Sequence, residues 1–362
     1  MIKVSFVDFK SEVFVPSGYI KKAVKSSVTL PKKDQDLMRK LKETAHPFEP
    51  AWWLRSPHLQ TLWPHYFRKA EPLETKDERF ELMDGDFIDA QWVGSKSGPI
   101  VIVLHGLEGS IKSIYANAML SAIVKQGWRG LFLHFRNCSH NTNRMDVTNH
   151  IGDTLDIMNI LSIIRHREPN VNLGCVGFSF GANVLLKLLG QMGSRCKIQA
   201  GACISPPFKL DVCSNFGKSS LACRMYERQL VHYMKCSIYR KFKNRKDAPV
   251  DLAVMGKCNT FRQFDSVVTA PLHGFLSLDE YYRDSSSYQY LSGVRTPTLV
   301  LHALDDPLIP LAATPKLSEF SPYTIAEYYS HGGHLGFVSG QQLGVAQYWL
   351  EKRVINFLKV LL

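Results

Sequence analysis

Short runs of apolar residues alternate with segments of helical periodicity, and this alternation constrains the fold of the 362-residue chain more than any other feature. Each run has the length of a strand and is almost wholly apolar, as expected for strands buried on both faces. Strands separated by helices run parallel, so the pattern predicts an α/β fold with a mostly parallel sheet covered by helices on both faces. The expected strands are PIVIVLHG, GLFLHF, LGCVGF, AGACISP, TPTLVLHAL and TIAEYYS.

The chain before this alternation is expected to lie outside the main series of strands and helices. Residues 1–77 should form a polar, Lys-rich and partly helical extension, followed by an aromatic arm. We expect three tryptophans of the arm to pack against the core: Trp52, Trp53 and Trp63. The next segment, ERFELMDGDFIDAQWVG, alternates around Asp84-Gly85 and predicts a β-hairpin with a tight turn.

The alternation stops between residues 207 and 290, where aromatic and basic residues are frequent and no clear buried strand occurs. An irregular block inside a series of strands and helices is typical of an inserted cap, which we expect to be mainly helical. The two parts of the α/β core would then be residues 78–206 and 291–362. The last helix is expected to carry the apolar residues Val345, Tyr348, Trp349, Ile355 and Leu358.

A G-x-S-x-G motif spans Gly177–Gly181, and its setting makes it informative. The buried strand LGCVGF runs directly into it. The helix that leaves it is expected to be amphipathic, with Asn183 and Lys187 turned away from the apolar face. This setting is typical of a nucleophile elbow, in which flanking glycines permit a sharp turn and the serine is strained. The Ser179 hydroxyl would then project above the sheet. The alternative is an ordinary serine in a glycine-rich turn.

A serine nucleophile needs a base, and the base needs an acid that orients it. Two loops beyond the carboxyl ends of strands carry suitable residues, and catalytic groups of open α/β sheets lie there. Asp305 and Asp306 follow one strand. We prefer Asp306, which begins a D-x-x-x-P turn, and expect the other carboxylate to cap a turn or helix. His331 and His334 follow the next strand, and the small residues before His334 favour it as the base.

Backbone amides are the expected oxyanion hole. Two N–H groups must point at the developing charge, and we assign them to Phe180, directly after the nucleophile, and to Leu107 in the loop HGLEG. The pattern H-x-x-H is also typical of zinc sites, but the chain offers no convincing third ligand. Neither a metal nor a cofactor is therefore expected.

Nine segments together resemble the YheT-like branch of the α/β-hydrolases, which includes bacterial predicted hydrolases and membrane-anchored animal lipid hydrolases. They are WWLRSPHLQTLWP, ERFELMDGDFIDAQW, HGLEGS, HFRNCS, GFSFGANVLLKLLG, FDSVVTAPLHGF, DEYYRDSSS, ALDDPLIP and HGGHLGF. The resemblance covers nearly the whole chain after the N-terminal extension. It implies an α/β-hydrolase fold with Ser179, Asp306 and His334 as the charge relay, acting on carboxylic esters, acylglycerols or phospholipids.

The chain departs from this branch at three positions where glycine is usual: Asn137, His140 and Ala182. Asn tolerates a left-handed backbone better than most residues, so we expect the loop around Asn137 to be kept. Ala182 is a mild change at a helix start. His140 is expected to lie near the site and to alter substrate entry.

These features predict a cofactor-independent serine hydrolase that cleaves carboxylic esters through an acyl-enzyme. Short- to medium-chain acyl esters, acylglycerols and phospholipids are the expected substrates. An acyltransferase on the same triad and a non-catalytic binding protein on the same fold are the alternatives. No helix-turn-helix, zinc-finger or RNP signature accompanies the basic composition, so a nucleic-acid partner is not expected.

The formal charge of +12 is confined to two segments. Residues 1–46 hold ten Lys or Arg against five acids, and residues 224–246 hold eight against one. A basic arm and a basic cap would suit an anionic lipid surface or a negatively charged substrate, and the alternative is a solvated charged face. No apolar run of about 20 residues and no signal-peptide core is apparent. The cysteines form no C-x-x-C pair. We therefore expect a cytoplasmic protein with peripheral membrane contact.

Overall fold

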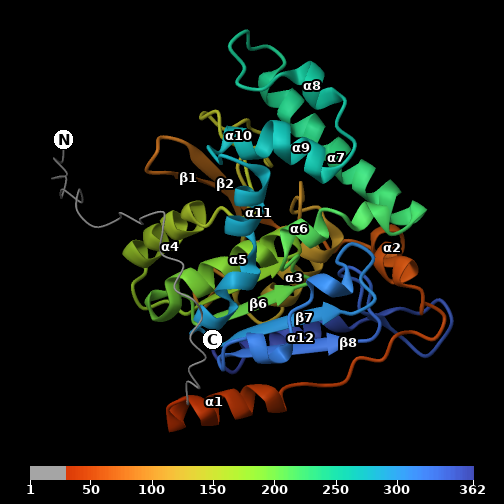
Figure 1. Cartoon of the computed structure of the whole chain (residues 1–362). Coiled ribbons are helices and arrows are strands. Elements are labelled where there is room, and N and C mark those ends of the chain that lie inside the picture. Colours follow the sequence, from red (N-terminus) through yellow and green to blue (C-terminus); the bar gives the residue numbers. More distant parts are fainter. Residues whose placement is uncertain (1–29) are drawn as a thin grey trace, which may run out of the picture.

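A single eight-stranded sheet forms the centre of the molecule (Figure 1), whose computed structural model describes residues 30–362. The strand order is β1-β2-β4-β3-β5-β6-β7-β8, and the strands from β4 to β8 run parallel. This confirms the predicted mostly parallel sheet. The strands are β1 Thr75–Glu81, β2 Phe87–Gly94, β3 Ile100–Leu104, β4 Arg129–Leu133, β5 Leu173–Phe178, β6 Ala200–Ile204, β7 Thr298–Ala303 and β8 Thr324–Tyr329.

The predicted hairpin is confirmed as the antiparallel edge of this sheet. Strands β1 and β2 pair with Phe80 opposite Ile88, and Gly85 in the turn has φ +84°. The other edge of β2 pairs antiparallel with β4. Strands β3 to β7 are buried along their whole length. This burial is why they read as continuous apolar runs in the sequence.

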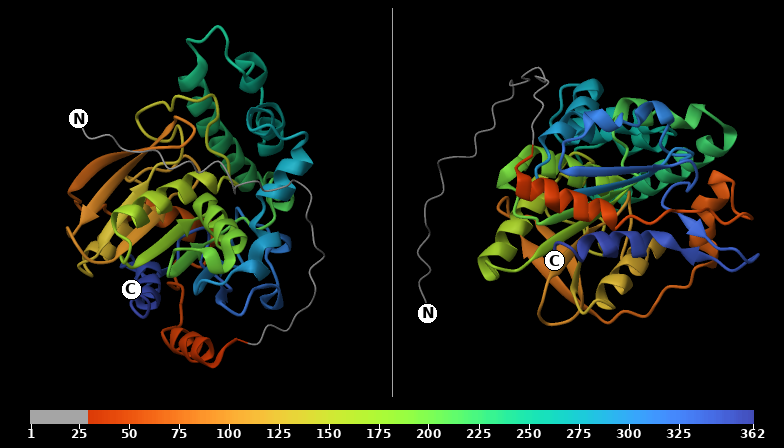
Figure 2. Two further views of the ribbon diagram at one scale, coloured as in Figure 1. Left: turned by 90° about the vertical axis from the view of Figure 1, so that its left-hand side faces the viewer. Right: turned by 90° about the horizontal axis from the view of Figure 1, so that it is seen from below.

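Helices cover both faces of the sheet and enclose two apolar layers. Helices α3, α12 and the N-terminal α1 pack on one face, and α4 and α5 on the other. Seen from below, α1 and α12 lie side by side in front of the sheet (Figure 2, right). None of the helices between residues 30 and 362 is long and apolar enough to cross a membrane. The bounds are α1 Lys32–Glu43, α3 Ile114–Val124, α4 Leu155–Arg167, α5 Phe180–Met192 and α12 Trp349–Leu358.

The segment between β6 and β7 is helical and forms the top of the molecule in Figure 1. Its long helix α7 shares a separate apolar cluster with the shorter helices that follow, including Val231, Phe242 and Phe264. Serine and threonine side chains cap three of these helices at Ser220, Thr260 and Ser277. The elements are α6 Leu210–Cys213, η2 Phe216–Lys218, α7 Leu221–Phe242, α8 Leu252–Gly256, α9 Phe261–Phe264, η3 Asp265–Thr269, α10 Ala270–Leu272, α11 Leu278–Ser285 and η4 Ser287–Gly293.

Two expectations about helices are wrong. The last helix begins only at Trp349, because Tyr348 belongs to the short strand β10 (Gln347–Tyr348), which pairs with β9 (Val338–Ser339). Helix α5 is buried nearly all round, because η4 and the loop before α4 cover its other face. There Asn183 donates to the carbonyls of Ile151 and Ser285. Lys187 likewise donates to a backbone carbonyl, that of Gly152.

The aromatic arm forms helix α2 (Pro57–Phe67), which lies against the loops that follow β8. The rings of Trp53 and Trp63 pack edge to face at 4.7 Å between centroids, as expected for residues of an arm against the core. Trp52 differs from the prediction: it is 57% exposed, and only its indole N–H is engaged, by the carbonyl of Gln341.

Candidate active site

Ser179 lies between strand β5 and helix α5 in a strained backbone conformation, with φ +50° and ψ −111°. Such a conformation costs a residue with a side chain about 1–3 kcal/mol. The surrounding contacts hold it, because the Ser179 N–H donates to the carbonyl of Ile204 at 2.8 Å. The strain predicted for the elbow is therefore present.

The flanking glycines are required by close packing. A Cβ on Gly181 would lie 2.5 Å from the carbonyl oxygen of Leu104, and one on Gly177 would lie 2.5 Å from the carbonyl oxygen of Gly181. Both distances are far below contact. Neither glycine has a positive φ, so they permit the predicted sharp turn by lacking a side chain and not by adopting a left-handed backbone. They let helix α5 approach the ends of β3 and β5.

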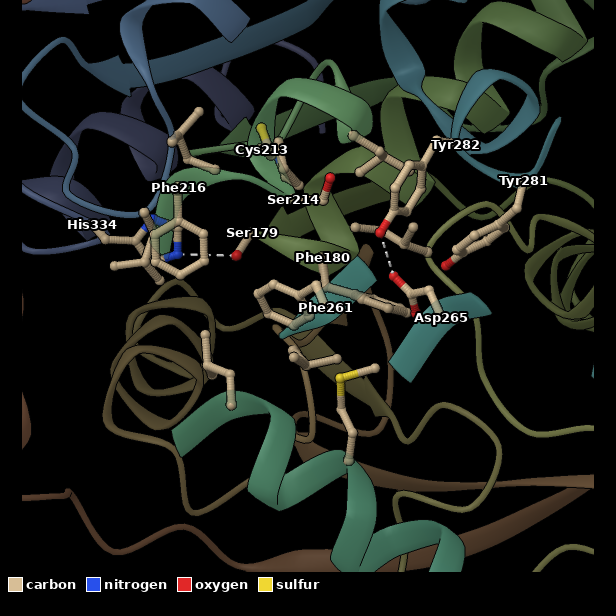
Figure 3. A pocket seen from close by; sticks show the side chains of 18 residues that line it. Ser179, Phe180, Cys213, Ser214, Phe216, Phe261, Asp265, Tyr281, Tyr282 and His334 are labelled. Atoms are coloured by element: carbon tan, nitrogen blue, oxygen red, sulfur yellow. Dashed lines mark hydrogen bonds between the residues drawn. The ribbon is translucent and has the colours of Figure 1, made fainter. Parts of the chain in front are cut away.

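Ser179, His334 and Asp306 are joined by two hydrogen bonds. The Ser179 Oγ lies 3.0 Å from His334 Nε2, and His334 Nδ1 lies 2.7 Å from Asp306 Oδ2 (the first contact is dashed in Figure 3). Asp306 is buried, and its other oxygen accepts from the amides of Leu308 and Ile309 at 2.8 and 3.2 Å. When the His334 proton is on Nδ1, where it can be donated to Asp306, Nε2 is free to accept from the Ser179 hydroxyl.

The neighbouring acid and histidine pair with each other instead. Asp305 Oδ2 lies 3.2 Å from His331 Nδ1, and Asp305 Oδ1 accepts from the Gly333 amide at 2.9 Å. Burial raises the pKa of Asp305. Asp305 thus ties its loop to the loop that carries His334, rather than capping a turn or helix of its own. Between residues 30 and 362 no three His, Cys, Asp or Glu side chains come together as metal ligands.

The two residues assigned to the oxyanion hole, Phe180 and Leu107, line the same cavity as Ser179. Neither N–H donates a hydrogen bond to any group in the part of the chain that the structure describes. The loop of Leu107 is held by Gly181, whose N–H donates to the carbonyl of His105 at 3.0 Å, and by Tyr115, whose hydroxyl accepts from the Gly106 amide.

His105 itself is a structural residue of this loop. Its Nδ1 donates to the Gly106 carbonyl at 2.6 Å, and its Nε2 accepts from the Phe135 amide at 3.1 Å. Complete burial lowers the pKa of His105 to about 3, so the ring is neutral. A neutral ring thus satisfies one backbone carbonyl after β3 and one backbone amide after β4.

Helix α2 holds the loop of His334, a contact that the sequence analysis missed. The Thr61 hydroxyl accepts from the His334 amide at 2.9 Å. The buried side chain of Gln60 makes two hydrogen bonds to the backbone of Val338, donating at 2.9 Å and accepting at 2.8 Å. One signal in the sequence could have indicated this contact: the polar pair Gln60-Thr61 lies between two leucines of an aromatic segment expected to pack against the core.

Two of the three departures from the resembled branch have a clear place in the structure. Asn137 has φ +63°, as expected, and its amide donates to the carbonyl and hydroxyl of Ser237 on α7. This side chain therefore connects the core to the cap. His140 is exposed and lines a separate surface hollow with Asp89 and Ser110. His140 does not line the cavity beside Ser179, and its effect on substrate entry stays a prediction.

A cavity of about 120 Å³ lies directly beside Ser179, between the core and the cap. Most of its lining is apolar and comes from both parts, including Leu107, Phe180, Leu230, Met234 and Ile309. His334 is at one end of the cavity, and Asp265 and Tyr281 are at the other (Figure 3). The arrangement places the Ser179 hydroxyl, which lies within hydrogen-bond distance of His334, beside a space suited to an apolar chain.

Comparison with known proteins places the chain in a family. It matches the family model for the alpha/beta hydrolase fold over residues 99–341. The chain belongs to the alpha/beta hydrolase fold family. Among its relatives, YheT of Escherichia coli (strain K12), an esterase by name, is 35% identical and aligns over 83% of this chain and 89% of its own. The resemblance to the YheT-like branch is thereby confirmed.

Other alpha/beta hydrolases are more distant. The monoacylglycerol lipase of Saccharomyces cerevisiae is 30% identical over 72% of this chain and 59% of its own length. Phospholipase ABHD3 of Mus musculus is 26% identical over 81% of this chain and 74% of its own. The solved structure of an esterase from Pyrococcus furiosus shares the fold with a TM-score of 0.53 at 18% identity, covering 86% of this chain and 96% of that one.

Replacing Thr61 with Val tests the support of His334 by α2. The change leaves the His334 amide without its acceptor, and a small displacement of a catalytic base costs rate. We expect ester hydrolysis by Thr61→Val to show kcat lower by roughly tenfold with little change in KM. Thr61→Ser, which keeps the acceptor, should retain the wild-type kcat. Wild-type kcat in Thr61→Val would contradict the positioning role.

Proposed function

We propose that the protein is a serine hydrolase that cleaves carboxylic esters, with Ser179 as nucleophile, His334 as base and Asp306 as the acid that orients it. The unbroken series of contacts from Asp306 through His334 to Ser179 supports this most directly. The strained elbow and the two free amides add further support. The esterase and lipase names of the relatives agree with the same chemistry.

The reaction begins when His334 Nε2 takes the Ser179 proton and the Ser179 oxygen bonds to the ester carbonyl carbon. The amides of Phe180 and Leu107 donate to the resulting oxyanion. His334 then gives the proton to the departing alcohol, and the C–O bond breaks to leave an acyl-enzyme. Water attacks by the reverse sequence and releases the acid, while Asp306 holds the His334 ring throughout.

Substrates with short- to medium-chain acyl groups suit the small apolar cavity between core and cap. Acylglycerols and phospholipids belong to the proposed substrate class because relatives are named monoacylglycerol lipase and phospholipase. An alcohol in place of water would make the same acyl-enzyme an acyltransferase. Analysis of products formed in the presence of glycerol separates the two reactions.

Replacing Ser179 with Ala is expected to lower kcat for p-nitrophenyl octanoate at least 1,000-fold, roughly the effect of losing a triad nucleophile. Asp306→Asn should also lower kcat by several orders of magnitude, because His334 loses the partner that fixes its tautomer. Asp305→Asn should cost much less. Ser97→Ala, at an exposed position far from the site, is the matched control. Undiminished hydrolysis by Ser179→Ala would contradict the proposal.

We propose further that the protein contacts anionic lipid through the start of α7 and the adjoining α2. Only part of the cap charge is available for this. Lys241 is buried and donates to Asn143, and Arg245 pairs with Asp146 and Asp247. These two basic residues of the cap are therefore already engaged by other groups of the protein.

The remaining charge is next to exposed apolar side chains. Leu221 and Met225 of α7 are 72% and 64% exposed, and Arg224 and Arg228 occupy the same helical face. The hydrogen bond between Tyr226 and His58 places this end of α7 against α2, whose Tyr66 is also exposed. Exposed apolar residues beside arginines are typical of a surface that enters a lipid interface.

Reversing two charges on this face tests the contact. Near an anionic membrane each basic residue contributes about 1 kcal/mol, so losing two arginines alone weakens binding roughly 30-fold. Arg224→Glu with Arg228→Glu also adds two repelled charges, and should therefore weaken binding to phosphatidylglycerol vesicles by at least this factor. The matched control is Lys96→Glu with Lys197→Glu, two exposed positions of the core. Co-sedimentation with phosphatidylglycerol and with phosphatidylcholine vesicles measures the binding of the wild-type protein and of both double variants. Equal wild-type binding to the two vesicle types would reject the contact.

A further inference from the structure

One carboxylate lines the mostly apolar cavity. Asp265 lies at the end of the cavity away from His334, beside Tyr281 and Tyr282 (Figure 3). It is 6% exposed. The mechanism proposed above does not use this side chain, because the acid that orients His334 is Asp306. A buried carboxylate in the wall of a binding cavity therefore needs its own explanation.

The surroundings of Asp265 satisfy it only in part. Its Oδ1 accepts from the Thr269 hydroxyl at 2.7 Å, and its Oδ2 accepts from the Tyr282 hydroxyl at 2.9 Å. A carboxylate has about four acceptor positions, so roughly two remain open. Asp265 makes no ion pair with any residue between 30 and 362. The nearby guanidinium of Arg262 faces the exposed Asp279 at 3.8 Å.

A buried carboxylate that makes no ion pair is costly for the fold, and the nearby charge of Arg262 offsets only part of this cost. Removing a charged group from water is unfavourable unless an opposite charge or a full set of hydrogen bonds compensates. Burial raises the pKa of Asp265 to about 6. An apolar side chain would fill the same wall at no such cost, so the cavity keeps a polar group at a place where packing alone gives no reason for one.

The backbone under Asp265 is also unusual. Residues Asp265–Thr269 form one π-helical turn between helices α9 and α10. Such turns are rare, and they occur frequently at functional sites. The turn brings the Asp265 carboxylate and the Thr269 hydroxyl together. The π-helical turn and the buried carboxylate in the cavity wall thus both single out Asp265.

The direction of the cavity indicates which part of an ester reaches Asp265. His334 gives its proton to the departing alcohol, so the alcohol part of the ester must lie on the His334 side of Ser179. The acyl part then extends the other way, past Phe180 and toward Asp265 (Figure 3). This assignment rests on the function proposed above.

We propose that Asp265 binds a hydrogen-bond-donating group, a hydroxyl or an ammonium, at the far end of the substrate's acyl chain. The preferred substrates are then esters of acids that carry such a group beyond an apolar stretch. A site built to bind a polar group discriminates strongly against an analogue that lacks it, because the buried acceptor stays unpaired. Plain alkyl esters remain substrates, but poorer ones at the matching chain length.

Matched esters test this preference. The probes are p-nitrophenyl esters of hexanoic, octanoic and decanoic acid, each plain, with a terminal hydroxyl and with a terminal amine. For the wild-type protein we expect kcat/KM to be at least tenfold higher for a substituted ester than for the plain ester at one of these lengths, and Asp265→Leu should remove this ratio. Asp265→Asn, which keeps an acceptor but no charge, should retain part of a hydroxyl preference and lose an ammonium preference.

Controls separate selectivity from folding. Asp279→Asn, the same change at an 89% exposed side chain, should leave the ratio at its wild-type value, and thermal unfolding shows whether each variant is folded. A purely structural role for Asp265 would lower the rates for plain and substituted esters alike, and that result would overturn the proposal. The proposal would also be overturned if the wild-type protein hydrolysed plain and substituted esters at equal rates at every chain length, provided that this hydrolysis requires Ser179. That second outcome leaves the proposed function standing, whereas absence of all ester hydrolysis would overturn both.

Discussion

The close approach of helix α5 to the end of strand β3 is the contact on which the rest of the candidate site depends. Because Gly181 has no side chain, its backbone packs against the carbonyl of Leu104. The Gly181 N–H donates to the carbonyl of His105. This one contact joins the elbow of Ser179 to the loop of Leu107. Ser179, the proposed nucleophile, and both candidate oxyanion donors are thereby fixed by the same contact in the core, before any substrate is present.

The other parts of the site come from distant segments that converge on this fixed centre. The loop of His334 is held from outside the core by Thr61 of the N-terminal arm and from within by Asp305. The cap supplies the far wall of the cavity, and Asn137 ties it to the core through Ser237. The arm and the cap are thus parts of the site, although neither belongs to the central sheet.

Much of this arrangement was predictable, because it follows from local patterns. Continuous apolar runs predict the buried strands, and alternating apolar and polar residues predict the hairpin. Ser179, Asp306 and His334 follow the ends of strands that a parallel sheet brings together. The errors arise where distant segments cover one another. The burial of Asn183 and Lys187 depends on η4, and the role of Thr61 depends on a contact across 273 residues. Neither leaves a periodic signal in the sequence.

The central claim is that Ser179 is activated by its surroundings and forms a covalent intermediate. Reaction of the folded protein with a fluorophosphonate probe, followed by peptide mass spectrometry, tests it most directly. The account predicts one adduct, located on Ser179 and absent from the Asp306→Asn and His334→Ala proteins on the same timescale. Folded protein that forms no adduct, or an adduct at another residue, would contradict it.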